Sequence, residues 1–218
     1  MTITDGQNER LAGDSRAELA TACRSIIDEL ASSTAQSDAF AMARDLVQEA
    51  AAILAAADHG RAYDGGEGSL ADYQHNDFID HSPLVGPLNP LAPPIAITFE
   101  AASVIGEVTF AAAYEGPPGC VHGGYIAAGF DEVLGIAQGL SGKPGMTARL
   151  VVQYRSPSPL FQALRFVGSI DHIEGRKIFT KGELRTVDDG RLCAEAEGLF
   201  ISMKPEFFQR MMSDRVEP

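Results

Sequence analysis

Hydrophobic positions change their spacing along this chain, and each change marks a new kind of segment. Residues 8–33 and 38–58 carry apolar side chains at helical spacing, and the second stretch is rich in alanine, a strong helix former. Residues 59–93 are rich in Gly, Asp, Pro and His, which is typical of irregular chain. From about residue 94 the pattern becomes one of strands with turn residues between them.

This pattern predicts four segments. They are a helical extension over 1–60, an irregular Pro/Gly-rich strap over 61–93, a main domain over 94–204 and a C-terminal tail over 205–218. Five prolines with interleaved Leu and Val over 81–94 exclude a helix or a central strand, yet the stretch is too apolar for a free linker. We therefore expect it to pack as a covering strap on the main domain.

The main domain combines one apolar helix with several predicted strands. The helix runs from 123 to about 140 and is apolar around most of its circumference, which indicates a buried helix. The expected strands are 95–100, 105–111, 147–154, 164–173, 177–187 and 192–203. One curved antiparallel sheet around one buried helix is an α+β arrangement. The order points to a hotdog fold with an N-terminal helical extension.

Composition narrows the class of protein. The 218 residues carry a net charge of −13, which argues against binding to nucleic acid or to anionic membranes. There is no run of about 18 apolar residues, so we expect no membrane span. The N-terminus is polar and lacks the pattern of a secretory signal. Three scattered cysteines favour a reducing compartment, and we expect a cytoplasmic protein.

The basic residues are unevenly placed. Between Arg61 and Lys143 there is no Lys or Arg, whereas residues 143–191 hold nine basic and five acidic side chains, a net charge of +4. A basic region on an acidic protein suits a small polyanionic ligand, and solvated strand faces explain it about equally well.

The stretch from Gly116 to Glu132 contains the strongest candidate chemistry. It joins a Gly/Pro-rich turn to the apolar helix, and amides at a helix start can stabilise a developing negative charge. Asp131 lies among apolar helix residues, where a carboxylate has to be paired or used. Asp131 could instead cap a neighbouring backbone group, and Glu132 could be the acid in its place.

Together these residues resemble a known group. His122-Gly123-Gly124, with Asp131 nine residues after the histidine, Thr147 a further sixteen on, and the segment Tyr154 to Pro159 after it, is similar to the PaaI/THEM4-like hotdog acyl-CoA thioesterases. The resemblance covers residues 88–203. It implies hydrolysis of acyl-CoA without a further cofactor, in a homodimer or a dimer of dimers. The substrate tunnel would lie at the interface between subunits.

The resemblance also implies a role for each residue. Asp131 would be general base or nucleophile, the Gly123 N–H would bind the oxyanion, and His122 would position the substrate or the oxyanion. Thr147 would orient water or the carboxylate, usually from the partner subunit. Each has a plainer alternative: a tight turn for Gly123, a helix start for His122, and the preference of Thr for strands. The family's optional Asn six residues before the histidine is Gly116 here.

A CoA substrate also needs contacts for its phosphates. Arg155, Ser156, Arg176 and Lys177 are the candidates, because arginine offers a planar fork that matches phosphate, and Gly124 allows a close backbone approach. Surface charges at strand ends are an equally good explanation.

Four further side-chain types are assigned no chemistry. We expect Tyr154 and Phe179 in the core. We expect no metal, because His59, His75 and His81 lack metal-ligand spacing, and we expect no nucleophilic role for Cys120.

Two other functions remain open. One is a hotdog hydratase or dehydratase, in which a His–carboxylate pair moves protons. The other is a non-catalytic module that binds or senses acyl-CoA. For the strap over 81–94 and the N-terminal helices, the hypothesis is that they line or cover the substrate tunnel.

Overall fold

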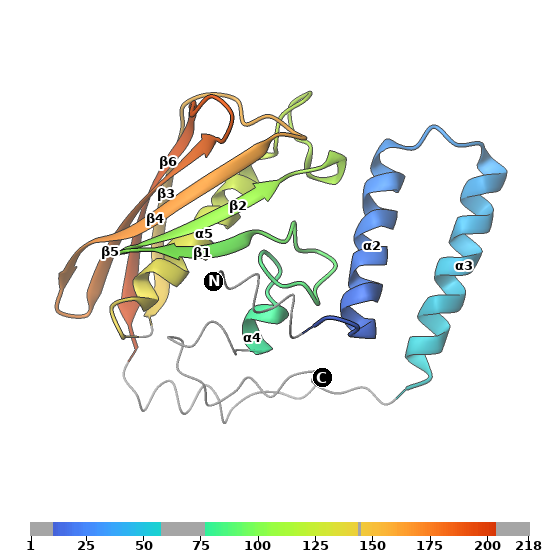
Figure 1. Cartoon of the computed structure of the whole chain (residues 1–218), viewed down its shortest axis with the longest axis horizontal. Helices are drawn as coiled ribbons and strands as arrows, with labels where there is room; N and C mark the ends of the chain where they lie inside the picture. The colour runs from blue at the N-terminus through green and yellow to red at the C-terminus, as the bar shows by residue number, and fades with distance from the viewer. Residues whose placement is uncertain (1–10, 58–76, 144, 204–218) are drawn as a thin grey trace.

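A curved sheet wraps one long helix, and two further helices stand to one side (Figure 1). This computed structural model describes residues 11–57, 77–143 and 145–203. Parts of the predicted extension and strap, including His59 and His75, and the predicted tail from 205 lie outside the described residues.

The sheet has six antiparallel strands in the order β1-β2-β4-β5-β6-β3. Their bounds are β1 Ala96–Glu100, β2 Ser103–Thr109, β3 Gly145–Tyr154, β4 Ala163–Glu174, β5 Lys177–Thr186 and β6 Leu192–Ser202. All six predicted strands are present, although the second and the third each begin two residues earlier than expected. Strands β1 and β3 form the two edges, so β3 has one edge without a partner strand in the described chain.

Helix α5, Gly123–Gly139, lies against the concave face of the sheet and forms the core with it. Phe130, Val133 and Leu134 are fully buried under the strands. The sheet can approach this closely because Gly168 and Gly182, which pair across β4 and β5, have no side chain. A Cβ at Gly168 would lie only 2.9 Å from the Val133 side chain. The α+β hotdog arrangement predicted from the sequence is therefore confirmed.

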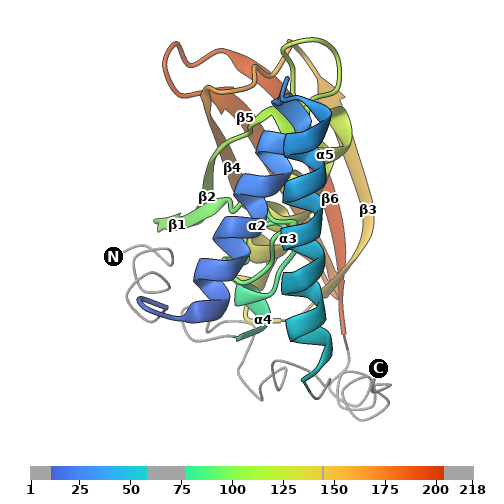
Figure 2. The same cartoon turned by 90° about the vertical axis from the view of Figure 1, so that its right-hand side faces the viewer.

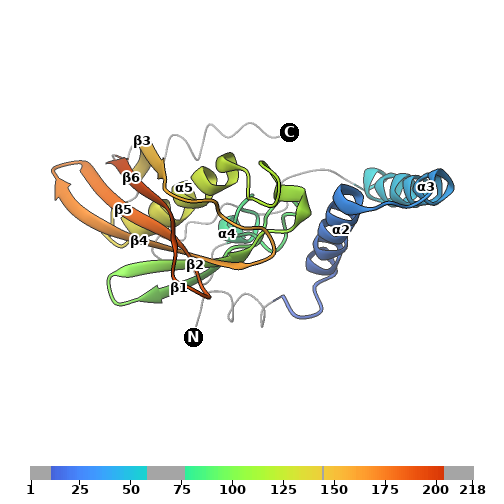
Figure 3. The ribbon, with the colours of Figure 1, turned by 90° about the horizontal axis from the view of Figure 1, so that it is seen from above.

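The N-terminal part forms two helices, α2 over Ser15–Ser32 and α3 over Ser37–Ala55. The Asp14 side chain caps α2 by accepting hydrogen bonds from the Arg16 and Ala17 amides, at 2.7 and 3.3 Å. Figure 2 shows the two helices in front of the sheet domain, and Figure 3 shows α3 standing off from it.

The segment after the gap at 58–76 packs against the domain. It begins with a short helix, α4 Asp77–Asp80, inside the region that the sequence predicted to be irregular. Val85 and Ala92 are buried, and Arg24 of α2 donates hydrogen bonds to the carbonyls of Pro87 and Asn89, at 3.2 and 3.1 Å. This part of the strap thus joins α2 to the sheet domain.

No helix in the described ranges is long and apolar enough to cross a membrane.

Candidate active site

The tip of α5 presents one unused backbone donor. His122 is the N-cap residue, and its Nδ1 accepts a hydrogen bond from the Gly124 N–H at 3.0 Å. The next two amides, of Tyr125 and Ile126, donate to the His122 carbonyl. Among the described residues, the Gly123 N–H has no acceptor. Gly123 is therefore the tip amide that remains available for an oxyanion, and Gly124 is already engaged.

The capping bond also fixes the state of the imidazole. A ring nitrogen that accepts a hydrogen bond carries no hydrogen, so the remaining hydrogen of neutral His122 is on Nε2. The ring is exposed to solvent, and its Nε2–H can donate to a ligand beside the helix tip.

The turn before the helix is held by backbone bonds on two sides. The His122 amide donates to the Tyr114 carbonyl, and the Val121 amide donates to the Ser158 carbonyl, both at 2.9 Å. Gly116 packs so closely that a Cβ there would lie 2.7 Å from the Cα of His122. Any side chain at 116 would displace the N-cap residue, which explains why a glycine fits this position.

Tyr154, at the end of β3, holds the helix tip from the other side. Its hydroxyl donates to the Gly123 carbonyl at 2.8 Å, and its ring lies over the Cα of Gly123. Tyr154 is 55% exposed, so the prediction that it belongs to the core was wrong. The aromatic side chain lies on the rim of the site because edge strand β3 has no neighbour on that side.

Helix α2 adjoins the same tip through the short 3₁₀ helix η1, Ala112–Tyr114. Burial raises the pKa of the Tyr114 phenol to about 12, and the nearby carboxylate of Asp28 on α2 adds to the shift. The Tyr114 ring meets the Tyr125 ring edge to face, with 4.8 Å between centroids. The N-terminal extension therefore reaches the neighbourhood of the candidate site.

Asp131 lies further along α5 and is paired with Thr147. The Thr147 hydroxyl donates to Asp131 Oδ1 at 2.9 Å, and both side chains are exposed. The two residues belong to one chain, whereas the resemblance implied a threonine from the partner subunit. One oxygen of the carboxylate thus has a fixed donor while the group faces solvent.

The neighbouring carboxyl, Glu132, is turned toward the strap instead. The Ser82 hydroxyl donates to Glu132 Oε1 at 3.2 Å, and Ser82 is itself buried. Desolvation by burial raises the pKa of Glu132, although the hydrogen bond from Ser82 opposes the shift. Glu132 therefore attaches the strap to α5, and Asp131 is the carboxylate that is open to a substrate.

Gly123 and Asp131 of one chain are separated along the helix. Eight residues at about 1.5 Å each place them roughly 12 Å apart along the axis. A thioester carbonyl must lie about 3 Å from both an oxyanion donor and an attacking group or its base. Within a single chain, Gly123 and Asp131 therefore cannot both contact the same carbonyl group.

The predicted phosphate contacts do not form one cluster. Arg155 and Ser156 follow the Tyr154 end of β3, whereas Arg176 and Lys177 lie at the β4–β5 turn. Strand β6 lies between the two pairs of residues. Tyr154 pairs with Ala194 of β6, and Lys177 pairs with Ile201 of β6. These two β6 residues are about 24 Å apart at roughly 3.4 Å per residue. Within one chain the four residues cannot bind one phosphate group together.

Each of the two arginines also has a partner. Arg155 forms an ion pair with Glu195 at 2.6 Å, and Arg176 donates to the Ser202 carbonyl at 3.0 Å. The Arg155 side chain is half exposed and stays within reach of a ligand near the helix tip.

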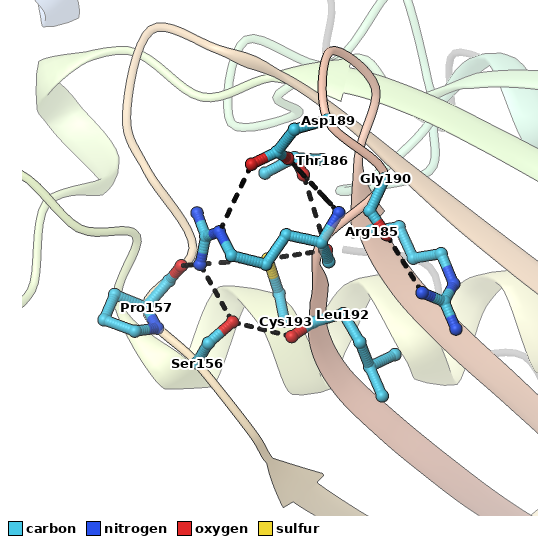
Figure 4. A network of polar contacts seen from close by, with 9 residues as sticks. Ser156, Pro157, Arg185, Thr186, Asp189, Gly190, Leu192 and Cys193 are labelled. Atoms are coloured by element: carbon cyan, nitrogen blue, oxygen red, sulfur yellow. Dashed lines mark hydrogen bonds and ion pairs between the residues drawn. The ribbon is translucent and has the colours of Figure 1, made fainter.

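Sequence reasoning missed Arg191, which fixes the segment after β3. Arg191 donates to Ser156 Oγ at 2.8 Å and to the Pro157 carbonyl at 2.7 Å, and the Ser156 hydroxyl donates to the Leu192 carbonyl (Figure 4). The adjacent Ser158 carbonyl accepts the Val121 amide, so this network supports the turn that leads to the helix tip. No sequence pattern marks such a contact between distant loops.

The β5–β6 turn in the same network is also well bonded. Asp189 accepts hydrogen bonds from the Thr186 hydroxyl and the Arg191 amide, and these contacts, the hydroxyl first, lower the pKa of the carboxyl (Figure 4). In the described ranges there is no group of three or more His, Cys, Asp or Glu side chains that could hold a metal ion.

Comparison with known proteins shows which family contains these residues. Residues 118–193, which contain the helix tip, Asp131 and Thr147, match the model of the thioesterase superfamily. Acyl-coenzyme A thioesterase THEM4 of Xenopus laevis is 42% identical over 91 residues, and that of Bos taurus is 39% identical over 92 residues. Each alignment covers 42% of this chain, and 41% and 38% of the respective relatives. The chain thus spans about two fifths of the length of these curated relatives.

A solved structure gives a longer match. A crystal structure described as a thioesterase superfamily protein shares 36% sequence identity and a TM-score of 0.72, over 87% of this chain and 96% of that chain. Such coverage requires residues before 77, so the match includes part of the helical extension. This chain belongs to the thioesterase superfamily and has its hotdog fold.

Proposed function

We propose that this protein hydrolyses acyl-CoA thioesters to the free acid and CoA. The observation that carries the proposal is the exposed Asp131 carboxylate, held by Thr147, on the helix whose tip presents the free Gly123 amide. The relatives named acyl-coenzyme A thioesterase support the choice of substrate.

In the proposed reaction, Asp131 either takes a proton from the attacking water or attacks the thioester carbonyl itself. In the second case the acyl group forms a mixed anhydride with Asp131, and water then hydrolyses this anhydride to the free acid and the carboxylate. Negative charge then develops on the carbonyl oxygen, where the Gly123 N–H and the His122 Nε2–H can donate hydrogen bonds. A preorganised donor of this kind is worth roughly 2.7–4 kcal/mol in other hydrolases. The CoA thiolate leaves without a general acid, because a thiol ionises near pH 8.5.

Two copies of the chain are needed to complete the site. Strand β3 is an open edge, with Met146, Val151 and Tyr154 40–55% exposed. The start of β3 holds Asp131 through Thr147, and its end holds Gly123 through Tyr154. If two β3 strands pair antiparallel about a two-fold axis, the start of one strand meets the end of the other.

This pairing supplies what a single chain lacks. It places the Asp131 carboxylate of one copy beside the Gly123 amide of the other, and a two-fold axis makes two such sites per dimer. Arg155 and Ser156 adjoin the same helix tip, so we propose that this end of β3 contacts the phosphates of CoA. The antiparallel arrangement also brings the Arg176 and Lys177 turn of the second copy toward that end.

We place the enzyme in a reducing compartment such as the cytoplasm. The free thiols of Cys23, Cys120 and Cys193 support this assignment.

The test is free thiol release from a panel of acyl-CoA substrates, measured for the wild type, Asp131→Asn and Glu132→Gln. The two variants each replace one carboxylate by an amide, at neighbouring positions of α5. Of the two carboxylates, only Asp131 faces the proposed substrate. Asp131→Asn should lose at least 100-fold in kcat/KM, whereas Glu132→Gln should keep most of it. Binding of acyl-CoA without thiol release would indicate a sensing module, and loss of water from a 3-hydroxyacyl substrate would indicate a dehydratase.

A further inference from the structure

Helix α3 has an apolar side that nothing in the described chain covers. None of its residues is buried. Its large hydrophobic side chains are 37–69% exposed, and they are Phe40, Met42, Leu46, Val47, Ile53 and Leu54. An exposed helix of this length ordinarily buries its apolar side against a neighbour.

These side chains form a single stripe. At about 100° per residue, all six fall within an arc of roughly 160°, and Ala39, Ala43 and Ala50 occupy the positions between them. The charged residues of the helix lie on the opposite side, and they are Asp38, Arg44, Asp45 and Glu49. The apolar stripe therefore carries no charge, although the protein as a whole has a net charge of −13.

Helix α2 also turns an apolar side away from the sheet domain. It is attached through buried Ala20 and through Arg24, which bonds to the strap. Its large hydrophobic side chains are 38–65% exposed, and they are Leu19, Ile26, Ile27 and Leu30. Figures 1 and 3 show α2 and α3 projecting together at one end of the long axis, with the sheet at the other end.

The exposed area is too large for a monomer and suits an interface. Ten large side chains that are each 37–69% exposed present on the order of 1,000 Å² of apolar surface over the two helices together. The largest apolar patch of a typical monomer is roughly 300–600 Å². A standard stable interface buries about 800 Å² on each partner.

We propose that α2 and α3 form a docking arm that packs against the same arm of a second copy of this chain. The uncharged stripe lets two copies of this acidic protein meet without placing like charges against each other. Alanines within the stripe allow two helices to approach closely, and an arm of two helices paired by a two-fold axis gives a bundle of four.

In this proposal the docking arm joins copies other than those that share a β3 edge, because α3, which carries the stripe, stands off from the sheet domain (Figure 3). The arm is thus the contact that links two β3-paired dimers. This link between dimers rests on the β3 pairing proposed above, and it does not depend on the hydrolysis itself.

The test compares two double variants of the full chain by light scattering after size exclusion. Leu46→Glu/Ile53→Glu adds two carboxylates to the stripe. Gln48→Glu/Ala52→Glu adds the same charge to the polar side of α3. Glutamate is a good helix former, and α3 has no buried residue to lose. We expect the wild type and the control to share one mass, and the stripe variant to have half of it.

Hydrogen exchange provides a second measurement on the same samples. The amides of residues 37–55 should exchange at least 10-fold faster in Leu46→Glu/Ile53→Glu than in the wild type, because an unpacked helix opens readily. An unchanged mass for the stripe variant overturns the proposal, as does a wild type that is no larger than a dimer. Thiol release per chain should remain near the wild-type value in both variants. A wild type that releases no thiol contradicts the proposed function and leaves the assembly result standing.

Discussion

The hydrogen bond from Thr147 to Asp131 gives the sharpest single prediction about catalysis. Thr147→Val replaces the hydroxyl by a methyl group of similar size on the same branched side chain. The bond that is lost is the 2.9 Å contact to Asp131 Oδ1, while strand β3 keeps its preference for a β-branched residue.

The size of the effect follows from the kind of bond. A hydrogen bond to a charged group contributes about 1.5–3 kcal/mol, and the lower end applies here because both side chains are exposed. If the bond orients Asp131 for attack, about 1.5 kcal/mol of transition-state stabilisation is lost, which is roughly a 10-fold fall in kcat. KM should change less than 2-fold, because Thr147 contacts the carboxylate rather than the bulk of the substrate.

The assay is steady-state thiol release with one acyl-CoA at several concentrations. Thr109→Val makes the same chemical change on an exposed threonine at the end of β2, for which no side-chain hydrogen bond exists in the described chain, and it should keep wild-type kinetics. Thr147→Ser retains a hydroxyl and should recover most of kcat. An unchanged kcat in Thr147→Val, or an equal fall in Thr109→Val, refutes the orienting role.

Three further predictions concern the fold and the helix tip. Gly168→Ala places a methyl group 2.9 Å from Val133 and should lower the free energy of unfolding by about 1–3 kcal/mol, measured by chemical denaturation. The control Gly135→Ala adds a methyl group that lies 3.8 Å from Phe200, and it should be neutral or stabilising. Burial raises the pKa of Glu132 in the folded protein above its unfolded value of 4.5. The wild type therefore loses stability as the pH rises from 4.5 toward the pKa of the folded state. Glu132→Gln removes this loss, and its unfolding free energy relative to the wild type should increase between pH 4 and pH 7; a constant difference contradicts the burial effect. Tyr154→Phe removes the bond to the Gly123 carbonyl, worth about 1 kcal/mol, and should reduce kcat roughly 5-fold with the fold intact by circular dichroism.

Much of the fold could be predicted because the pattern of each element is local. The apolar circumference of α5 and the turns at Gly175 and Gly190 are visible in the sequence, and the structure has the helix and strands where these signals place them. The sequence could not reveal that the apolar faces of α2 and α3 are turned outward. Periodicity shows that a helix has an apolar side, but it does not show what covers that side.

The residues of the candidate site on α5 could be predicted by counting along the chain, and Thr147 on β3 followed from the family resemblance alone. The spacing from His122 to Asp131 belongs to one helix and can be counted. The contacts of Tyr154 with Gly123 and of Arg191 with the loop after β3 depend on strand register and on how the sheet curves. Arg155 and Arg176 both follow strands and looked equivalent in the sequence. They lie at opposite ends of the sheet because antiparallel strands reverse direction at every turn.

Each proposed catalytic site combines Asp131 of one copy with the Gly123 amide of another. Two variants that should each be inactive test this arrangement directly. Asp131→Asn removes the carboxylate. Gly123→Pro removes the tip N–H and adds a ring whose Cβ would lie 3.3 Å from the Tyr154 side chain. Proline is otherwise well accommodated at the first helical position, and His122 already has the extended backbone, φ −61° and ψ 131°, that a following proline requires.

The measurement is thiol release after the two inactive proteins are denatured together and refolded as a mixture. In a mixed dimer one site has both mutations and the other has neither, so one of its two sites is active. Random pairing makes about half of the dimers mixed, and the mixture should therefore have about a quarter of the wild-type activity per chain. Each variant refolded alone should remain inactive. A mixture that stays as inactive as its components would contradict the account, because it would show that both groups must belong to one chain.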